Sequence, residues 1–368
     1  MSARGCAATV AALASVAMGC GGHAQTPARA GDDRPSPPIV RGFVSGDLAD
    51  SNVAAMRTWG ANVVRLQLRP RFFASQWGVA DTAVWARVVD SAAVWVERLG
   101  RQGLKVVVDM HEPPLPSAGT GGAPGDAFWD SPELTSRLRT RWSDLAHRLH
   151  PLKRYIWGYD LLNEPLDRRD EPNGPHAWPP LALSIVRTIR TIDPDVWIIY
   201  EPGPGDAFAG FATLRPLPDP HVIYSAHFYY PARFTQQGIG QPVFGPSDTV
   251  HFPGRIRLVS WDADRLARMV QPAVDFQQRY HVPIYVGEFS VVRWAPEPDA
   301  VVWLRDAIAI FESHGWSWTY HAFREFNGWS LEDDETFPAT GGPLPQVPPN
   351  PTARARVIRR ALARNGAP

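Results

Sequence analysis

The sequence is poor in cysteine. Only Cys6 and Cys20 occur in 368 residues, and both lie within the first twenty. Because no cysteine follows Cys20, the folded part of the chain is expected to use no disulfide.

An excess of charge of one sign is also lacking, since 37 lysines and arginines balance 37 aspartates and glutamates. A nucleic-acid-binding protein needs a basic excess to displace counterions from phosphates, so we expect no nucleic acid partner. A hydrophobic fraction of 44% with 20% charged residues excludes a disordered chain. A final helix is expected to expose a basic face made of Arg354, Arg356, Arg359, Arg360 and Arg364.

Long hydrophobic runs are absent. The uncharged stretch Ala7–Met18 has 12 residues, too few to span a bilayer as a helix. It follows a positive charge at Arg4 and precedes small residues, which is the layout of a secretory signal. We therefore predict a signal peptide over residues 1–20 and a flexible, Gly- and Pro-containing tether over residues 21–38.

Two interpretations of the cleavage site remain open. The segment Ala17–Cys20 (AMGC) resembles a bacterial lipobox, which would attach lipid to Cys20 and anchor the protein at the cell surface or in the periplasm. The segment Gly22–Ala24 (GHA) instead fits an ordinary signal peptidase, which would release the protein outside the cell. Both interpretations predict an exported protein.

Several catalytic motifs are missing. The sequence has no Gly-x-Ser-x-Gly elbow, no Walker loop, no Gly-x-Gly-x-x-Gly after a strand and no His-Glu-x-x-His. These absences speak against a serine hydrolase, a P-loop nucleotidase, a dinucleotide-dependent enzyme and a zinc protease. We expect neither a cofactor nor a metal ion.

From Ile39 onward, short β-branched runs alternate with longer amphipathic segments, the pattern of parallel strands covered by crossover helices. We predict an α/β fold, a single (β/α)8 TIM barrel with long βα loops over residues 39–365. The strands are expected to begin near Ile39, Asn62, Leu104, Tyr155, Val196, Val222, Val282 and Trp316. Helices are expected over residues 48–59, 82–101, 131–147, 179–191, 262–280 and 299–313, a short turn over 207–213, and long loops over 112–130, 166–178 and 230–260.

Polar side chains recur at the carboxyl ends of the expected strands, although a strand buried on both faces should be apolar. Strand ends of a barrel converge on the face where barrel enzymes keep their active sites, so these residues are expected to form one site. In chain order they are Arg65, Asp109, His111, Asn163, Glu164, Glu201, His227, Tyr229 and Glu288.

Glu164 and Glu288 decide the chemistry of this site. They end the fourth and seventh expected strands and would face each other across the barrel mouth. Glycoside hydrolysis requires two such carboxyl groups, one protonated and one ionised. A nearby Arg65 would keep Glu288 ionised, while the neutral Asn163 would let Glu164 hold a proton. We predict that both glutamates are catalytic.

Tryptophan is abundant, with 15 residues. Aromatic rings pack well against the C–H faces of sugars, and several tryptophans fall on the expected loop face. Of these, Trp178, Trp294 and Trp318 are predicted to contact substrate. Five others are assigned to helix packing: Trp59, Trp85, Trp95, Trp142 and Trp303.

The motifs together resemble glycoside hydrolase family 5, the large cellulase family. The resemblance is carried by residues 109–111 (DMH), 158–165 (GYDLLNEP), 227–229 (HFY) and 287–289 (GEF), in the family's order and at its strand positions. It implies a retaining double displacement with Glu164 as acid/base and Glu288 as nucleophile, their carboxyl groups about 5 to 5.5 Å apart.

The resemblance also assigns supporting roles. Arg65 and Tyr229 would hydrogen-bond the nucleophile, and Asn163 would hold the sugar 2-hydroxyl. His111 and His227 would line the subsite where cleavage occurs.

The chain departs from the family pattern in its first and eighth expected strands. The first lacks the usual Asn after Gly42-Phe43. In the eighth, either Trp318 or His321 occupies the place of the family's sugar-stacking tryptophan, and both are retained as candidates.

We expect a monomeric, exported, retaining glycosidase that acts on a neutral β-linked glycan, of the β-glucan, cellulose or mannan type. One alternative is a carbohydrate-binding surface lipoprotein whose barrel has lost catalysis. The other is a transglycosylase that uses the same two carboxyl groups.

Overall fold

The structure is a computed structural model that describes residues 35–46, 48–114, 126–239, 249–332 and 351–366. The predicted signal peptide, the proposed lipid attachment at Cys20 and all of the tether except residues 35–38 lie outside the described residues. Residues 34–368 form one compact unit.

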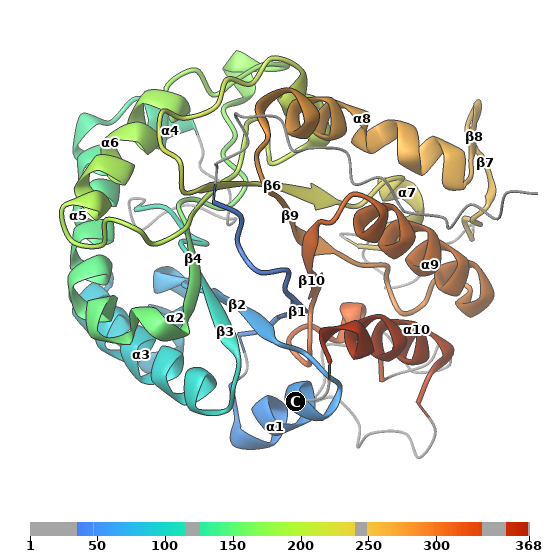
Figure 1. Ribbon diagram of the computed structural model, residues 1–368, viewed down its shortest axis with the longest axis horizontal. Coiled ribbons are helices and arrows are strands. Elements are labelled where there is room, and N and C mark those ends of the chain that lie inside the picture. Colours follow the sequence, from blue (N-terminus) through green and yellow to red (C-terminus); the bar gives the residue numbers. More distant parts are fainter. Residues whose placement is uncertain (1–34, 47, 115–125, 240–248, 333–350, 367–368) are drawn as a thin grey trace, which may run out of the picture. The chain divides into compact units, whose positions relative to one another are not determined.

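Eight parallel strands close into a barrel in the order β1-β10-β9-β6-β5-β4-β3-β2 (Figure 1). Each lies where a strand was expected, which confirms the predicted (β/α)8 barrel. Their bounds are β1 (Arg41–Val44), β2 (Val63–Gln67), β3 (Lys105–Asp109), β4 (Ile156–Asp160), β5 (Ile198–Tyr200), β6 (Val222–Phe228), β9 (Ile284–Phe289) and β10 (Ser317–His321).

Seven longer helices surround the barrel (Figure 1). Local signals set their starts: in α5, Pro132 takes the first helical position and the Ser131 side chain accepts the Leu134 N–H. After β5 the connection holds only the 3-10 turn η3 (Phe208–Ala212), as expected. The helices are α1 (Asp50–Thr58), α3 (Asp81–Arg101), α5 (Pro132–Leu149), α6 (Trp178–Arg190), α8 (Ala263–Tyr280), α9 (Glu297–Ser313) and α10 (Ala353–Leu362).

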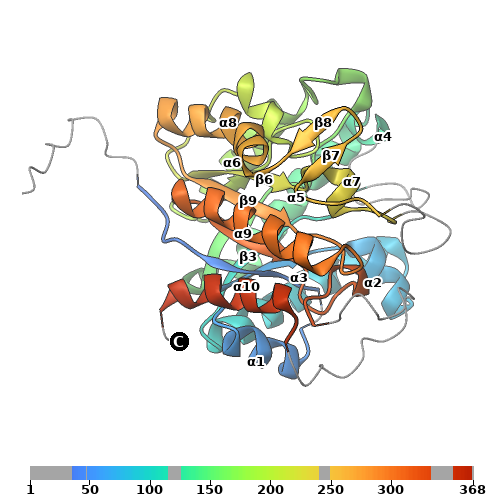
Figure 2. The same cartoon turned by 90° about the vertical axis from the view of Figure 1, so that its right-hand side faces the viewer.

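The loops carry short elements that the sequence pattern did not predict. They are the helices α2 (Pro70–Trp77), α4 (Asp126–Trp129) and α7 (Ala232–Thr235), the 3-10 turns η1 (His150–Tyr155), η2 (Arg168–Asp170), η4 (Asn327–Trp329) and η5 (Ala363–Asn365), and the hairpin of β7 (Gly254–Ile256) and β8 (Val259–Trp261). Of these elements, α2, α4, α7, β7 and β8 lie toward the right-hand side of Figure 2.

The barrel interior has an apolar floor beneath a polar layer. Along β2, Val63 belongs to the floor, and Arg65 points the same way two residues later because side chains alternate along a strand. Gly42 lets β1 approach β2, since a Cβ there would lie 1.9 Å from the Val63 carbonyl oxygen. The floor consists of Val40, Val63, Val107, Trp157, Ile199, Ile223 and Tyr285.

One expectation about α10 is wrong. Arg354 is fully buried, so it is not part of the exposed basic face, whereas Arg356, Arg359, Arg360 and Arg364 are exposed as expected. Among the described residues, no helix is both long enough and apolar enough to cross a membrane.

Candidate active site

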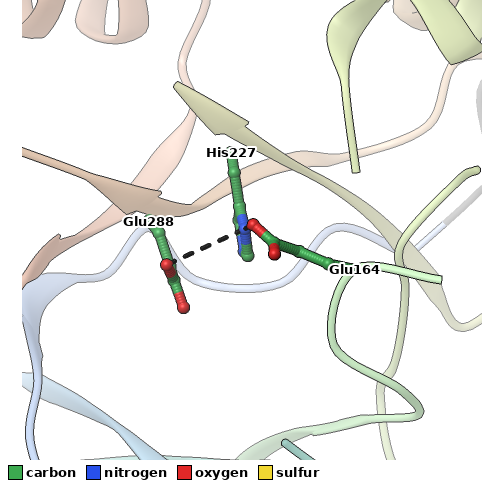
Figure 3. Close-up of side chains that lie close together, drawn as sticks. All are labelled: Glu164, His227 and Glu288. Atoms are coloured by element: carbon green, nitrogen blue, oxygen red, sulfur yellow. Dashed lines mark hydrogen bonds and ion pairs between the residues drawn. The ribbon is translucent and has the colours of Figure 1, made fainter. Parts of the chain in front are cut away.

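Three of the predicted site residues meet where the strands end. Glu164 lies four residues beyond β4, His227 lies near the end of β6 and Glu288 near the end of β9. Figure 3 shows the two glutamate side chains approaching each other from different elements, with His227 between them. Carboxylate oxygens of the two glutamates lie within 4.8 Å of each other.

The Glu288 carboxylate is surrounded by donors. Arg65 Nη1 lies 2.7 Å from Oε1, and the Tyr229 hydroxyl donates to Oε2 at 2.8 Å. His321 Nδ1 lies 3.0 Å from the same Oε2. Burial would raise the pKa of Glu288, but His321, His227 and Arg65 hold that pKa well below its ordinary value. Glu288 is therefore an anion in the folded protein.

Glu164 has a different environment. Its side chain is 36% exposed, against 6% for Glu288, so it is the carboxyl group that solvent reaches. Its backbone adopts a left-handed conformation with φ of 44°, a strained geometry that clusters at functional sites. The backbone N–H donates to Glu201 Oε2 at 2.6 Å, and Oε1 lies 2.9 Å from His227 Nδ1. These two contacts fix the carboxyl group above Glu288.

Arg65 organises the layer below. Its buried guanidinium contacts the carboxylates of Asp109, Asp160, Glu201 and Glu288 at 3.2, 2.9, 2.7 and 2.7 Å. Burial would lower the pKa of Arg65, but these carboxylates raise it well above its ordinary value.

Arg65 is also connected to two further predicted residues, directly to Asn163 and through Asp109 to His111. Its Nη2 donates to Asn163 Oδ1 at 3.0 Å, so the amide oxygen of Asn163 is used as an acceptor. His111 joins the network through Asp109, with Nδ1 and Oδ2 2.8 Å apart.

His227 links this layer to Glu164. Its Nε2 lies 3.4 Å from Asp206 Oδ2 and 3.5 Å from Glu201 Oε1. Burial would lower the pKa of His227, but Glu288, Glu201 and Asp206 raise it well above its ordinary value. His227 is therefore a cation that donates toward Glu164.

Asp160 and Asp206 are members of the network that the sequence analysis missed. Burial and the Glu201 charge raise the pKa of both carboxyl groups well above the ordinary value. Asp160 interrupts an apolar strand, a signal that was available in the sequence. Asp206 lies in a loop, five residues after Glu201, and no sequence pattern marks it.

Two sets of described residues have the composition and spacing of a metal site: Glu164, His227 and Glu288, and Glu201, Asp206 and His227. Several of their oxygens already accept hydrogen bonds, from Arg65, from Tyr229 and from the Glu164 backbone. We interpret both sets as parts of one hydrogen-bonded network.

The predicted substrate-binding tryptophans require two corrections. Trp318 is fully buried and its Nε1 donates to Glu312 in α9, because it is an outward-facing residue of β10. Trp178 is also fully buried, with its Nε1 on the Glu201 carbonyl oxygen at 2.7 Å. Neither can contact a substrate. Trp294 is partly exposed, and its Nε1 donates to the Gln237 carbonyl oxygen in the loop after β6.

His321 is the residue of β10 that reaches the site. Its Nδ1 lies 2.7 Å from the Tyr229 hydroxyl, and its side chain is 17% exposed. The Trp329 ring lies 6.0 Å from the imidazole at an angle of 34°, which supports the plane of His321 from the next loop.

Comparison with known sequences identifies the family of this chain. Residues 41–327 match the family described as Cellulase (glycosyl hydrolase family 5). The chain is 24% identical over 271 residues to Cellodextrinase A of Ruminococcus flavefaciens, covering 72% of this chain and 75% of that protein. It is 24% identical over 264 residues to Endoglucanase C of Acetivibrio thermocellus, covering 63% of this chain and 71% of that protein.

Solved structures share the fold. Endoglucanase Cel5A from Thermotoga maritima superposes with a TM-score of 0.64 at 20% identity, covering 88% of this chain and 96% of that one. The cellulose synthase subunit Z of Clostridioides difficile superposes with a TM-score of 0.66 at 18% identity, covering 88% of this chain and 99% of that one. Because the family match spans well over half of its length, this chain belongs to the cellulase family, glycosyl hydrolase family 5, and is an O-glycosyl hydrolase.

Proposed function

We propose that this protein is a retaining glycoside hydrolase that cleaves β-linked glucan chains internally, with Glu288 as nucleophile and Glu164 as acid/base. The observation that carries the proposal is the approach of their carboxylate oxygens to within 4.8 Å. Retaining enzymes keep their carboxyl groups about 5 to 5.5 Å apart, whereas inverting enzymes need about 6.5 to 9.5 Å for a water molecule.

In the first step, a Glu288 carboxylate oxygen attacks the anomeric carbon and the glycosidic C–O bond breaks. Glu164 gives its proton to the departing oxygen, so the leaving chain departs as an alcohol. The unequal exposure of the two groups suits these roles, because the acid must reach the leaving group while the nucleophile stays under the sugar.

In the second step, a water molecule attacks the anomeric carbon of the glycosyl-enzyme. The ionised Glu164 accepts a proton from this water, and Glu288 leaves as a carboxylate. Arg65 and Tyr229 stabilise the departing anion through the hydrogen bonds described above. We assign to the Asn163 amide nitrogen the hydrogen bond to the sugar 2-hydroxyl, because its Oδ1 already accepts from Arg65.

The β-glucan substrate is supported by the names of the related proteins, which include endoglucanases and a cellodextrinase. The balanced charge of the chain also suits a neutral polysaccharide.

Reducing-sugar release tests the proposal over a panel of cellulose, mixed-linkage β-glucan, mannan and xylan. Product sizes distinguish internal from terminal cleavage, and proton NMR of the first product reports whether the anomeric configuration is retained. The wild type should release β-configured oligosaccharides from a β-glucan. The Glu288→Gln variant, checked for folding by circular dichroism, should lose nearly all activity; an inverted product or an active variant would contradict the proposal.

The same assays separate the two alternatives. A carbohydrate-binding barrel without catalysis would show affinity for a glycan and release no reducing ends. A transglycosylase would form longer products when an acceptor sugar is supplied, at the expense of hydrolysis.

We also propose that the protein is exported through its first twenty residues. Two sequence observations support this proposal: the apolar stretch Ala7–Met18 and the small residues around Cys20. Labelling with a radioactive fatty acid in a bacterial host, compared with a Cys20→Ser variant, distinguishes a lipid anchor from free release. Retention of the full-length chain in the cytoplasm would contradict export.

A further inference from the structure

Three polar atoms at the end of β6, β9 and β10 form a closed triangle. The Tyr229 hydroxyl lies 2.8 Å from Glu288 Oε2 and 2.7 Å from His321 Nδ1, and the third side, from Nδ1 to Oε2, is 3.0 Å. Every pair in the triangle is within hydrogen-bond distance, although the ionised Glu288 can only accept.

The number of protons in the triangle decides whether it is stable. With Nδ1 unprotonated, the Tyr229 proton must serve two acceptors, and the Nδ1 lone pair faces the Oε2 lone pairs at 3.0 Å. With a proton on Nδ1, His321 and Tyr229 are both donors. The Tyr229 hydroxyl then donates to Oε2, and Nδ1–H donates to Oε2 or is shared between Oε2 and the Tyr229 hydroxyl oxygen. The geometry therefore selects an Nδ1–H form of His321, as neutral tautomer or as imidazolium.

We propose that His321 is a positioning residue for the nucleophile: through Nδ1–H it is a further hydrogen-bond donor to Glu288, beside Arg65 and Tyr229, and it stabilises the free carboxylate. The inference rests on the proposed function of Glu288. It gives His321 a role distinct from that of a sugar-stacking surface. The neighbouring Trp329 ring lies 6.0 Å from the imidazole, at an angle of 34° to it, and packs beside His321.

The charged and titratable groups around Glu288 come from five other elements. They are Arg65 on β2, His111 after β3, Glu164 after β4, His227 and Tyr229 at the end of β6, and His321 on β10. Arg65 binds Oε1, whereas His227 Nδ1 is 3.9 Å from Oε2. Oε2 therefore depends on Tyr229 and His321 for its short contacts.

A further donor to the carboxylate affects the two chemical steps in opposite ways. It lowers the basicity of Glu288, which weakens its attack on the anomeric carbon, and it improves Glu288 as the leaving group when water attacks. Loss of His321 should therefore slow breakdown of the glycosyl-enzyme more than its formation.

Carbon-13 NMR of the glutamate side chains tests the inference without turnover. The Glu288 carboxyl signal is assigned by its loss in Glu288→Gln and followed against pH in the wild type, His321→Leu and His321→Asn. Leucine removes the donor, whereas asparagine places an amide N–H near the position of Nδ1. We expect the Glu288 midpoint to rise by about one pH unit in His321→Leu and by less than half as much in His321→Asn. His147→Leu, on the exposed face of α5, is the control and should leave the midpoint unchanged.

A midpoint in His321→Leu within about 0.2 pH unit of the wild type would overturn the inference. If His321→Leu does not fold, His321→Asn is compared with His321→Gln, whose amide falls nearer to Nε2. Only the asparagine variant should then keep the low midpoint, and equal midpoints would overturn the inference.

Kinetics supply the second measurement. With an activated aryl glycoside, His321→Leu should accumulate glycosyl-enzyme that mass spectrometry detects, and the acid limb of kcat/KM should move to higher pH. A wild type that hydrolyses no glycan would refute the proposed function. The NMR result would still decide whether His321 donates to Glu288.

Discussion

Arg65 contacts four buried carboxyl groups, so its removal is expected to destabilise the folded protein. Arg65→Met keeps much of the side-chain volume but leaves Asp109, Asp160, Glu201 and Glu288 buried without their shared cation. Removing one partner of a single buried ion pair costs about 3 to 5 kcal/mol. Since Arg65 contacts all four of these buried carboxyl groups, we expect a loss of at least about 3 kcal/mol in the free energy of unfolding at pH 7.

The pH dependence of this loss has a defined sign. In the wild type, Arg65 is among the groups that lower the pKa of Glu201 and Glu288 against the effect of burial. Carboxyl groups with a lowered pKa stabilise the folded state above their unfolded pKa, and this contribution is lost as the pH falls. Without Arg65 the buried carboxyl groups take up protons more readily, so the difference between the two proteins should shrink from pH 7 toward about pH 4.5.

Urea titration, monitored by tryptophan fluorescence, measures the loss of unfolding free energy and its dependence on pH. Arg101→Met serves as the matched control, because Arg101 pairs with Glu97 on the surface of α3 and the two side chains are 71% and 41% exposed. Surface pairs of this kind contribute about 0.3 to 0.5 kcal/mol. A loss below about 1 kcal/mol in Arg65→Met, or a loss that does not change with pH, would refute the assignment of Arg65 as the cation that holds the network.

Two further variants test the corrected and the missed residues. Trp178→Ala should cost about 3 to 5 kcal/mol in unfolding free energy, because it empties a fully buried site; an unchanged stability would mean that the indole is at the surface. Asp206→Asn removes a titratable carboxyl group 3.4 Å from His227 Nε2 and should lower the pKa of His227, measured by NMR of its imidazole; an unchanged pKa would exclude Asp206 from the network.

The barrel and the convergence of the site were predictable from sequence because both follow from strand periodicity. Buried parallel strands show as short apolar runs, and residues at their carboxyl ends meet on one face whatever the loop lengths are. Arg65, Glu164, His227 and Glu288 were identified by this rule alone, and the structure brings them together.

The wrong prediction for Trp318 and the failure to predict Asp206 also have physical causes. Trp318 and His321 lie in one strand, but Trp318 faces the helices while His321 contacts Tyr229 and Glu288, and composition does not distinguish these two directions. Asp206 reaches His227 through a left-handed backbone with φ of 56° in a loop, where no periodic pattern exists to place a side chain. Loop geometry therefore explains why Asp206 was missed, whereas Asp160 ends the strand β4 and could have been recognised there.

The central claim is that Glu288 forms a covalent bond with the sugar. An activated 2-deoxy-2-fluoro cellobioside should form a glycosyl-enzyme that breaks down slowly, because the fluorine destabilises the cationic transition state. Peptide mass spectrometry should locate a single sugar adduct on Glu288, and the Glu288→Gln variant should not be labelled. An adduct on another residue, or hydrolysis of the probe by an enzyme that never becomes labelled, would contradict this account.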